Sequence, residues 1–539
     1  MKERLWQFQK DEASLSRTYR IEASSLRRER FTKFYVDSIA QLSAVDFEKL
    51  DESSRVDYIL FQNHLGRLQT QLAQRAKWFD GAKRVATFAD LIIGLDEERT
   101  LGRPVDAYAS AVTLAKLTTE IQAIQAKITE GSLSITPEVG FPAWQLTKEL
   151  VDVLSTWFHY YDGYDPAFSW WVRKPYEAAS EALTALVASL EAEALVVKNE
   201  SGTEIAGYAV GREVLEADLA YEMIPYSPEE LIEVGEREYR WCEAEMRKAS
   251  QELGFGDDWR QALEHVKTLH VASGKQPELV RELAEEAIAF VEANDLVTVP
   301  AIAKETWRMK MMSPKDQLVN PFFLGGEAII VSYPTDEMTH ERKMMSMRGN
   351  NRHFSRATVQ HELIPGHHLQ MYMLDRYRSY RSIFGTPFWI EGWALHWEML
   401  LWDLNFPVKP EDRIGMLFWR MHRCVRISFS LKFHLGLMTA QECVETLVER
   451  VGHERANAEG EVRRSFSGAY PPLYQVAYMI GGLQFRAMHQ ELVGRGLMTN
   501  QQFHDAILRE NEMPVTILRE VLKGNSIPAN GPEPWRFLG

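Results

Sequence analysis

Residues 361–368 read HELIPGHH, and this stretch restricts how the chain around it folds. On an unbroken α-helix, His367 would lie about 9 Å of rise beyond His361 and face about 120° away from it. His368 would return to the same side of the helix, but about 10.5 Å along the axis. Pro365 lacks an amide donor and its ring clashes with the carbonyl oxygen four residues earlier, while the next residue is a permissive glycine. The stretch therefore predicts a helix that bulges or breaks immediately before His367.

The same eight residues carry the ligand types of a metal site. A zinc peptidase helix usually contains HExxH, in which the two histidines bind the ion and the glutamate acts as general base. Here two additional residues separate the histidines, so the predicted break would let His361 and His367 each approach one ion to about 2 Å. We predict both as zinc ligands and Glu362 as the base, with His368 as the alternative second ligand. The competing interpretation is a capped helix end with buried, hydrogen-bonded histidines.

A third ligand is expected from residues 389–398, WIEGWALHWE. Glu391 lies among aromatic and aliphatic residues, where burial of an uncompensated carboxylate is costly. A bound cation would remove that cost, so we predict Glu391 as the third zinc ligand. Glu398 is the second candidate, and His396 is a candidate partner of a ligand. The alternative role for Glu391 is that of a helix cap.

The rest of the sequence predicts a mainly α protein. Helical spacing of apolar residues dominates positions 1–294, where Ser227, followed by a proline and two acids, marks a helix start. Three short β-prone segments follow, at 296–299, 306–309 and 328–333. We expect them to form a small sheet beside the metal-binding helix, and the helical pattern then returns.

We expect two portions packed as one continuous body. They are a helical N-terminal portion at 1–294 and a catalytic portion at 295–539, which holds the sheet and the metal-binding helices. Within the second portion, Gly325 and Gly326 precede the last β-prone segment. This pair predicts either a tight turn or an edge along which a substrate binds.

Composition limits the function classes. The 539 residues carry 61 Lys and Arg against 76 Asp and Glu, and the formal net charge of -15 disfavours nucleic-acid binding. Hydrophobic residues are 45% and charged residues 25%, which is ordinary for a globular protein. The first residues lack the apolar core of a signal peptide, and no apolar run approaches the roughly 18 residues of a membrane helix. We therefore predict a cytoplasmic protein without membrane or nucleic-acid partners.

The chain resembles the bacterial family called domain of unknown function 885. The resemblance rests on the HExxPGHH signature, matched by residues 361–368, and on an EGWA segment, matched by 391–394. It extends over most of the chain, including residues 211–213 and 227–231. It implies a mostly helical, elongated fold with a deep cleft. It also implies a peptidase or carboxypeptidase-like activity, in a branch of the zinc peptidases whose third ligand is glutamate.

A further segment, residues 426–434, looks like the Arg-rich helix of this family that ends in a histidine, here His434. Ser430 and Lys432 stand where the family usually has Asp and Gly. The resemblance makes His434 a candidate catalytic residue.

Arg464, followed by Tyr470, Tyr474 and Tyr478, resembles the Arg and Tyr-x-x-Gly region of the same family. A tyrosine hydroxyl in a zinc peptidase can donate to the developing oxyanion, so we predict Tyr478 as catalytic, with Tyr474 or His434 as alternates. An arginine grips a carboxylate at two points, so Arg464 is predicted to bind substrate, together with Tyr474. The alternatives are core packing for the tyrosines and a structural ion pair for the arginine.

These features predict a zinc-dependent metallopeptidase, either a carboxypeptidase or an oligopeptidase, that hydrolyses short peptides with metal-activated water. One alternative is a zinc amidohydrolase acting on a non-peptide metabolite, and another is a metal-binding scaffold without turnover. The presence of Glu362 beside the ligands favours an enzyme over a scaffold. The oligomeric state is left open, with a homodimer among the options.

Overall fold

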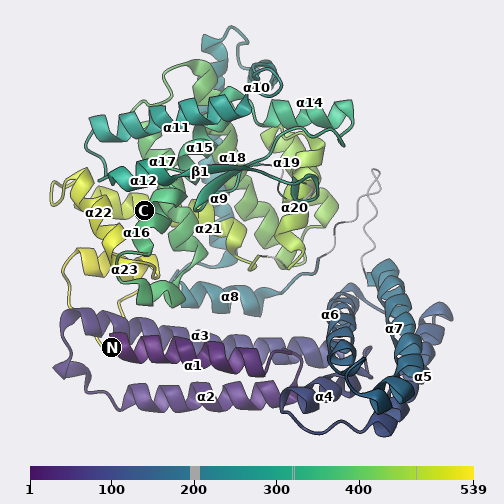
Figure 1. The fold of residues 1–539 in the computed structure, drawn as a ribbon. Helices are drawn as coiled ribbons and strands as arrows, with labels where there is room; N and C mark the ends of the chain where they lie inside the picture. Colours follow the sequence, from purple (N-terminus) through teal and green to yellow (C-terminus); the bar gives the residue numbers. More distant parts are fainter. Residues whose placement is uncertain (195–204, 206, 318–319, 321, 469, 539) are drawn as a thin grey trace. The chain divides into compact units, whose positions relative to one another are not determined.

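The computed structural model describes residues 1–194, 205, 207–317, 320, 322–468 and 470–538. These residues form twenty-three α-helices, two 3-10 helices and one two-stranded sheet, which confirms the predicted mainly α class (Figure 1). None of the helices in the described ranges has the length and apolar character needed to cross a membrane.

The chain divides into two compact units. Unit 1 comprises residues 1–5, 47–64 and 209–539, and unit 2 comprises residues 6–46 and 65–208. The boundary predicted from the sequence, between residues 294 and 295, lies inside unit 1 and stays a prediction.

Helices account for most of both units. The helices up to residue 208 are α1 (Lys2–Thr18), α2 (Ser25–Ser43), η1 (Phe47–Lys49), α3 (Glu52–Ala82), α4 (Ala89–Thr100), α5 (Ala107–Thr129), α6 (Pro137–Tyr161) and α7 (Pro166–Ala194). The later helices are α8 (Arg212–Tyr221), α9 (Pro228–Glu252), α10 (Trp259–Thr268), α11 (Gln276–Ala293), α12 (Ala301–Thr306), α13 (Pro314–Gln317), α14 (His340–Gly349), α15 (Arg352–Glu362), α16 (His367–Leu374), η2 (Ser379–Phe384), α17 (Pro387–Asp403), α18 (Pro410–His434), α19 (Ala440–Val451), α20 (Arg455–Phe466), α21 (Tyr474–Leu492), α22 (Asn500–Glu510) and α23 (Val515–Leu522).

Unit 2 contains a bundle in which α7 packs on both α5 and α6. On α5, Leu114, Leu117 and Ile121 recur at three- and four-residue spacing and are fully buried. Asp106 caps this helix by accepting a hydrogen bond from the amide of Ala109. The pattern that predicts a helix from sequence therefore also identifies the buried face of this bundle.

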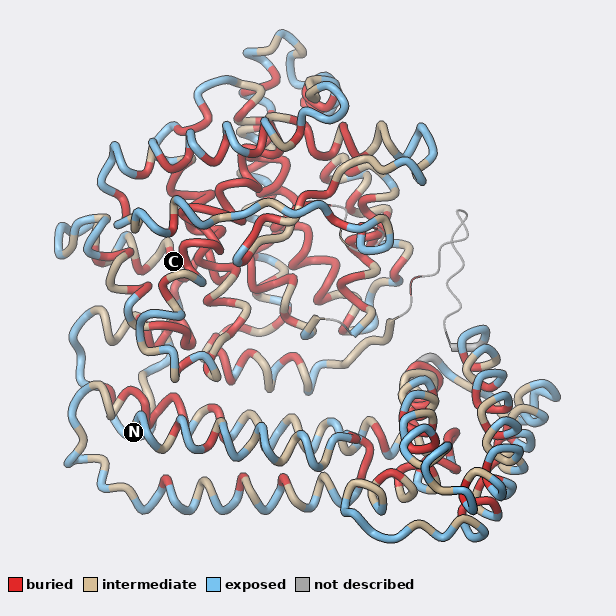
Figure 2. The backbone as a smooth tube through the Cα atoms, viewed as in Figure 1, coloured by how far each residue is buried: buried red, intermediate tan, exposed pale blue. Residues whose placement is uncertain are grey.

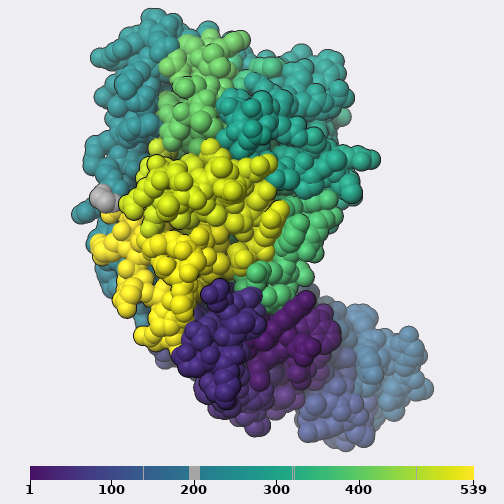
Figure 3. All heavy atoms as spheres, turned by 90° about the vertical axis from the view of Figure 1, so that its left-hand side faces the viewer, coloured from purple at the N-terminus to yellow at the C-terminus, as the bar shows by residue number. Residues whose placement is uncertain are grey.

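The core of unit 1 is centred on α18, which packs on α9, α15, α19 and α21. Every residue of α18 from Ile414 to Leu431 is buried, and Figure 2 shows the buried backbone concentrated in this part of the molecule. The predicted start of α9 is confirmed, because Ser227 caps it and Glu230 completes a capping box. The last helices of the chain form a continuous part of the face of unit 1 seen in Figure 3.

A small parallel sheet lies beside α15. Strand β1 (Arg308–Met311) pairs with β2 (Ala328–Val331), with Arg308 opposite Ala328. Ile329 and Val331 of β2 belong to the same buried cluster as Val359 of α15. The sheet thus forms where two of the three β-prone segments predict it, and it packs on the helix that carries the HELIPGHH stretch.

The first β-prone segment, residues 296–299, forms no strand, and that part of the prediction is wrong. Its polar groups bond to α22 instead. The carbonyl of Leu296 accepts a hydrogen bond from His504, and both the amide and the hydroxyl of Thr298 donate to Asp505. Because these side-chain partners satisfy the backbone, the segment does not need a neighbouring strand.

Helices α17 and α21 approach so closely that their backbones touch at two glycines. A Cβ atom on Gly392 of α17 would lie 2.6 Å from the carbonyl carbon of Gly481 on α21. A Cβ atom on Gly481 would lie 2.9 Å from the Gly392 Cα and closer still to the carbonyl oxygen of Phe388. No side chain fits between these two helices at this point, so their separation is fixed by backbone contact.

Substitution of Gly481 by Ala tests this contact, and its neighbour on the same helix supplies the control. We expect Gly481→Ala to lower the free energy of unfolding by about 1–3 kcal/mol through overpacking. A Cβ on Gly482 would meet the movable side chain of Leu395 at 3.1 Å, so Gly482→Ala should cost less. Both changes gain the same helix propensity of about 1 kcal/mol, so their difference isolates the contact. Equal stability of the two variants in urea unfolding would contradict the proposed role of the contact.

Candidate metal centre

The HELIPGHH stretch breaks the helix as its sequence predicts. Helix α15 ends at Glu362 and α16 begins at His367, and the Ile364–Pro365 peptide bond between them is cis. The amide of Gly366 donates to the carbonyl of Gln360 across the break, at 3.0 Å. The predicted departure from regular α geometry is therefore confirmed.

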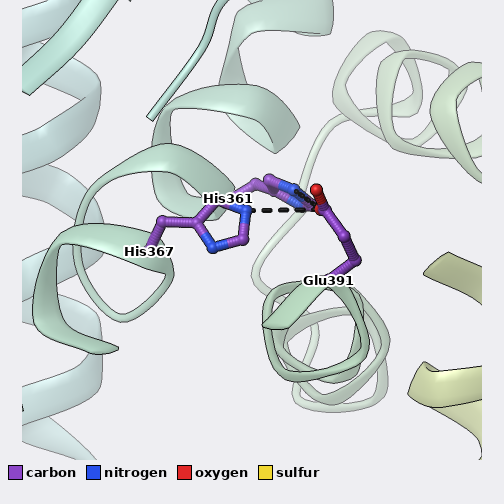
Figure 4. Close-up of side chains that lie close together, drawn as sticks. All are labelled: His361, His367 and Glu391. Carbon is purple, nitrogen blue, oxygen red and sulfur yellow. Dashed lines mark ion pairs between the residues drawn. The ribbon is translucent and has the colours of Figure 1, made fainter. Parts of the chain in front are cut away.

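The break brings two imidazoles and one carboxylate to a common point (Figure 4). The Oε2 atom of Glu391 lies 3.3 Å from Nε2 of His361 and 3.3 Å from Nε2 of His367. Ligand atoms about 2.0–2.1 Å from a tetrahedral zinc ion are themselves separated by about 3.3 Å. All three side chains are buried, and Oε2 of Glu391 has no hydrogen-bond partner among the described residues. Both distances to Glu391 match this value and all three ligand atoms lie within 4.8 Å of one another, so the donor set fits a zinc ion.

Other side chains hold the two clustered imidazoles in place. His361 donates from Nδ1 to Oε1 of Glu398 at 2.7 Å, and Nδ1 of His367 lies 3.1 Å from Oε1 of Gln370. This pattern directs both Nε2 atoms toward the common point, as is usual for histidine ligands of metals. Glu398, the second candidate for the third ligand, therefore lies behind His361 rather than in the cluster.

The structure separates the two neighbouring histidines of the stretch. His367 belongs to the cluster, whereas both ring nitrogens of His368 lie near backbone carbonyl oxygens, those of Gly326 at 3.3 Å and Ala303 at 3.0 Å. His396 is also placed elsewhere, because its Nε2 atom pairs with Nε2 of His504 at 3.0 Å. Of the histidines considered from the sequence, His361 and His367 are the two that meet Glu391.

Electrostatics of the cluster favour a bound cation. Burial would raise the pKa of the Glu391 carboxyl, but the positively charged imidazoles of His367 and His361 hold this pKa well below its usual range. Burial would lower the pKa of His361, but the adjacent carboxylates of Glu391 and Glu398 raise it to about 9. Without a metal, protons on the imidazoles compensate the buried carboxylates, and a cation can replace them.

A cavity of about 260 Å³ opens at the cluster. It brings together Glu362, Tyr474, Tyr478 and Arg464, all of which were candidates from the sequence. The hydroxyl of Tyr474 donates to Oε1 of Glu391. The cavity lining also includes polar, aromatic and aliphatic residues from other elements: Phe322, Phe323, Leu324, Gly325, Ile330, Thr358, Met371, Ile390, Trp419, Arg423, Arg426 and Tyr470.

The structure does not bring His434 into this cavity. It is the last residue of α18, and its ring packs near Phe433 and Phe466. Burial among these rings lowers the pKa of His434 to about 4. We therefore assign it no catalytic role.

Three lining residues have positions in the cavity that the sequence analysis does not predict. Arg423 and Arg426 project from one face of α18 into the cavity lining. Their spacing of three residues on a buried helix is the only feature of the sequence that indicates this shared position. Gly325 lies directly against Glu362: a Cβ atom there would lie 2.8 Å from the Glu362 carbonyl oxygen and closer still to Oε2. Gly325 therefore limits the position of the candidate base, a role that neither predicted alternative, a turn or a substrate-binding edge, includes.

Two solved structures share the fold. One is "a putative lipoprotein of unknown function from Shewanella oneidensis", with a TM-score of 0.70 and 18% identity over 96% of this chain and 99% of that chain. The other is "the putative lipoprotein from Colwellia psychrerythraea", with a TM-score of 0.52 and 17% identity over 77% of this chain and 75% of that chain. The predicted cytoplasmic location is contradicted by these two structures, since both are of proteins described as lipoproteins.

No curated protein matches the chain. One family model does, over residues 20–522, and its description is "Bacterial protein of unknown function (DUF885)". The match covers both units of the structure and includes the three clustered side chains. The chain therefore belongs to this family, DUF885.

Proposed function

We propose that this protein is a zinc-dependent metallopeptidase that hydrolyses short peptides. The observation that carries the proposal is the convergence of His361, His367 and Glu391, in which both histidine nitrogens lie 3.3 Å from one carboxylate oxygen, the separation of tetrahedral zinc ligands. The candidate base, Glu362, lines the same cavity beside them. Three protein ligands leave a fourth position for water, which distinguishes a catalytic zinc site from a structural one.

Zinc held by these three residues would lower the pKa of water and polarise the amide carbonyl. The carboxylate of Glu362 accepts the proton of the attacking water and passes it to the leaving nitrogen. This transfer needs the carboxylate in one orientation, and Gly325 leaves the space in which it lies. The chemistry is thus divided between a ligand set and a separately positioned base.

Tyr478 is the better of the two tyrosine candidates for the oxyanion. The hydroxyl of Tyr474 is already bonded to Glu391, so Tyr474 orients a ligand. The ring of Tyr478 stacks near His361, with centroids 6.1 Å apart, and the guanidinium groups of Arg423 and Arg426 lie over it. In our proposal the Tyr478 hydroxyl donates to the oxygen of the tetrahedral intermediate, where the two cations favour negative charge.

The cavity itself favours a small substrate. A cavity of about 260 Å³ has room for a small part of an extended chain and excludes a folded protein. A net charge of -15 repels polyanions such as nucleic acids. An amidohydrolase acting on a non-peptide metabolite would share the same chemistry, and a digest of a peptide library beside a panel of small amides separates the two.

Metal content and turnover test the assignment of ligands and base. We expect about one zinc per chain by elemental analysis, because one complete ligand set is present among the described residues. His361→Ala should lose most of the metal, whereas His368→Ala should retain it. Glu362→Gln should keep its zinc and lose about 10²- to 10⁴-fold in kcat, the usual contribution of a general base. Full activity of Glu362→Gln would refute the base, and a zinc-free wild-type protein would refute the ligand set.

A second variant tests the position of the base without changing its chemistry. Gly325→Ala places a methyl group where the Glu362 carboxylate lies, and a displacement of about 1 Å costs on the order of 100-fold in rate. We expect kcat to fall by this amount while zinc content stays at the wild-type level. Gly94→Ala is the matched control, because a Cβ there meets nothing within 4 Å. Wild-type kcat in Gly325→Ala would show that the base is held by something else.

A further inference from the structure

One wall of the cavity carries more positive charge than it has partners for. Arg426 places Nε and Nη2 at 2.8 and 2.7 Å from one oxygen of Glu461, and Arg423 lies 3.4 Å from Glu398. Arg464 reaches the other oxygen of Glu461 only at 3.9 Å, beyond hydrogen-bond distance. Three guanidinium groups therefore share two carboxylates within ion-pair distance in the described part of the chain.

The neighbouring histidines do not change this balance. Burial lowers the pKa of His453 to about 3 and, together with the nearby arginines, holds the pKa of His422 well below its usual range. Both are neutral at pH 7. Glu391 and Glu362 lie at the metal-binding cluster, where a bound divalent cation would match their two negative charges. One positive charge on the arginine wall is therefore left without a partner.

Hydrogen-bonding groups are also left over at this wall. Nε of Arg464, Nη1 of Arg426 and Nε of Arg423 are buried and have no hydrogen-bond partner among the described residues. All three arginines are at least nine-tenths buried, and all three line the cavity. Leaving a buried charged donor without a partner is costly, and a bound anion removes the cost.

We propose that the wall formed by Arg464, Arg426 and Arg423 binds the C-terminal carboxylate of the substrate, which makes the protein a carboxypeptidase. This inference rests on the proposed function, and it adds the substrate class and the end from which the chain is cleaved. A single carboxylate matches the single unpaired positive charge, and its two oxygens suit the forked donors of arginine.

Tyr478 lies beside both the wall and a metal ligand. The centroid of its ring is 6.1 Å from that of His361 and 4.4 Å from the guanidinium carbon of Arg426. A carboxylate held by the arginines would therefore lie close to the metal-binding cluster, which suits cleavage of a bond near the C-terminus of the substrate.

Binding to a zinc-loaded Glu362→Gln protein tests this without relying on turnover. The probes are N-acetyl-alanyl-phenylalanine, its C-terminal amide, and N-acetyl-alanyl-aspartate amide, which carries its carboxylate on a side chain. By calorimetry we expect the free acid to bind about 30-fold or more tightly than the amide, the usual effect of one lost partner in a buried charge pair. The aspartate amide should bind like the phenylalanine amide.

Removal of one arginine should abolish this discrimination. Adding Arg464→Met to the Glu362→Gln protein should weaken binding of the free acid by a similar factor and leave binding of the amide unchanged, so the two losses do not add. Unchanged amide binding also shows that the variant is folded, and Arg464→Lys should retain part of the discrimination. Arg420→Met is the matched control: Arg420 lies on α18 near Arg423 but pairs with Glu238 outside the cavity, so discrimination should persist.

Each outcome has a distinct meaning. Equal binding of the free acid and the amide overturns the carboxylate site, even if the wild-type protein hydrolyses peptides. Binding of the aspartate amide as tightly as the free acid overturns the assignment to the C-terminus. Discrimination in binding, with no hydrolysis of any peptide by the zinc-loaded wild-type protein, supports the carboxylate site and refutes the peptidase.

Discussion

The buried carboxylate of Glu391 is the constraint on which the rest of the site depends. A carboxylate removed from water needs positive charge or hydrogen-bond donors close by, and here two imidazoles and the hydroxyl of Tyr474 supply them. The imidazoles come from α15 and the start of α16, the carboxylate from α17 and the hydroxyl from α21. Four helices must therefore keep their mutual positions for one charged group to remain buried.

Two features of the backbone hold these four helices in their mutual positions. The helix break at residues 363–366 moves His367 to the same point as His361, which no continuous helix allows. The contact of Gly392 with Gly481 holds α17 against α21, so Glu391 and Tyr474 stay within hydrogen-bond reach. The site is built on helices packed by direct backbone contact, and such elements hold side chains more firmly than loops do.

The parts of the site that the sequence predicts are those governed by local geometry. The break follows from a proline and a histidine spacing of six, and Glu391 stands out because its apolar surroundings make an unpartnered carboxylate improbable. Arg464 is predicted from the family resemblance, but its grouping with Arg423 and Arg426, and the contact of Gly325 with Glu362, join elements distant in sequence, so no local pattern reveals them. The sequence predicts His434 at the site, but it lies outside the cavity lining. It is eight residues beyond Arg426, which is about 12 Å along the helix axis.

Glu398 joins the two halves of the site, because it accepts a hydrogen bond from His361 and pairs with Arg423. A change of charge at Arg423 would therefore alter the basicity of a metal ligand as well as the wall of the cavity. Arg464 lies instead 3.9 Å from Glu461, an acid outside the metal-binding cluster. A change of charge at position 464 would therefore alter the wall of the cavity without reaching a metal ligand through Glu398.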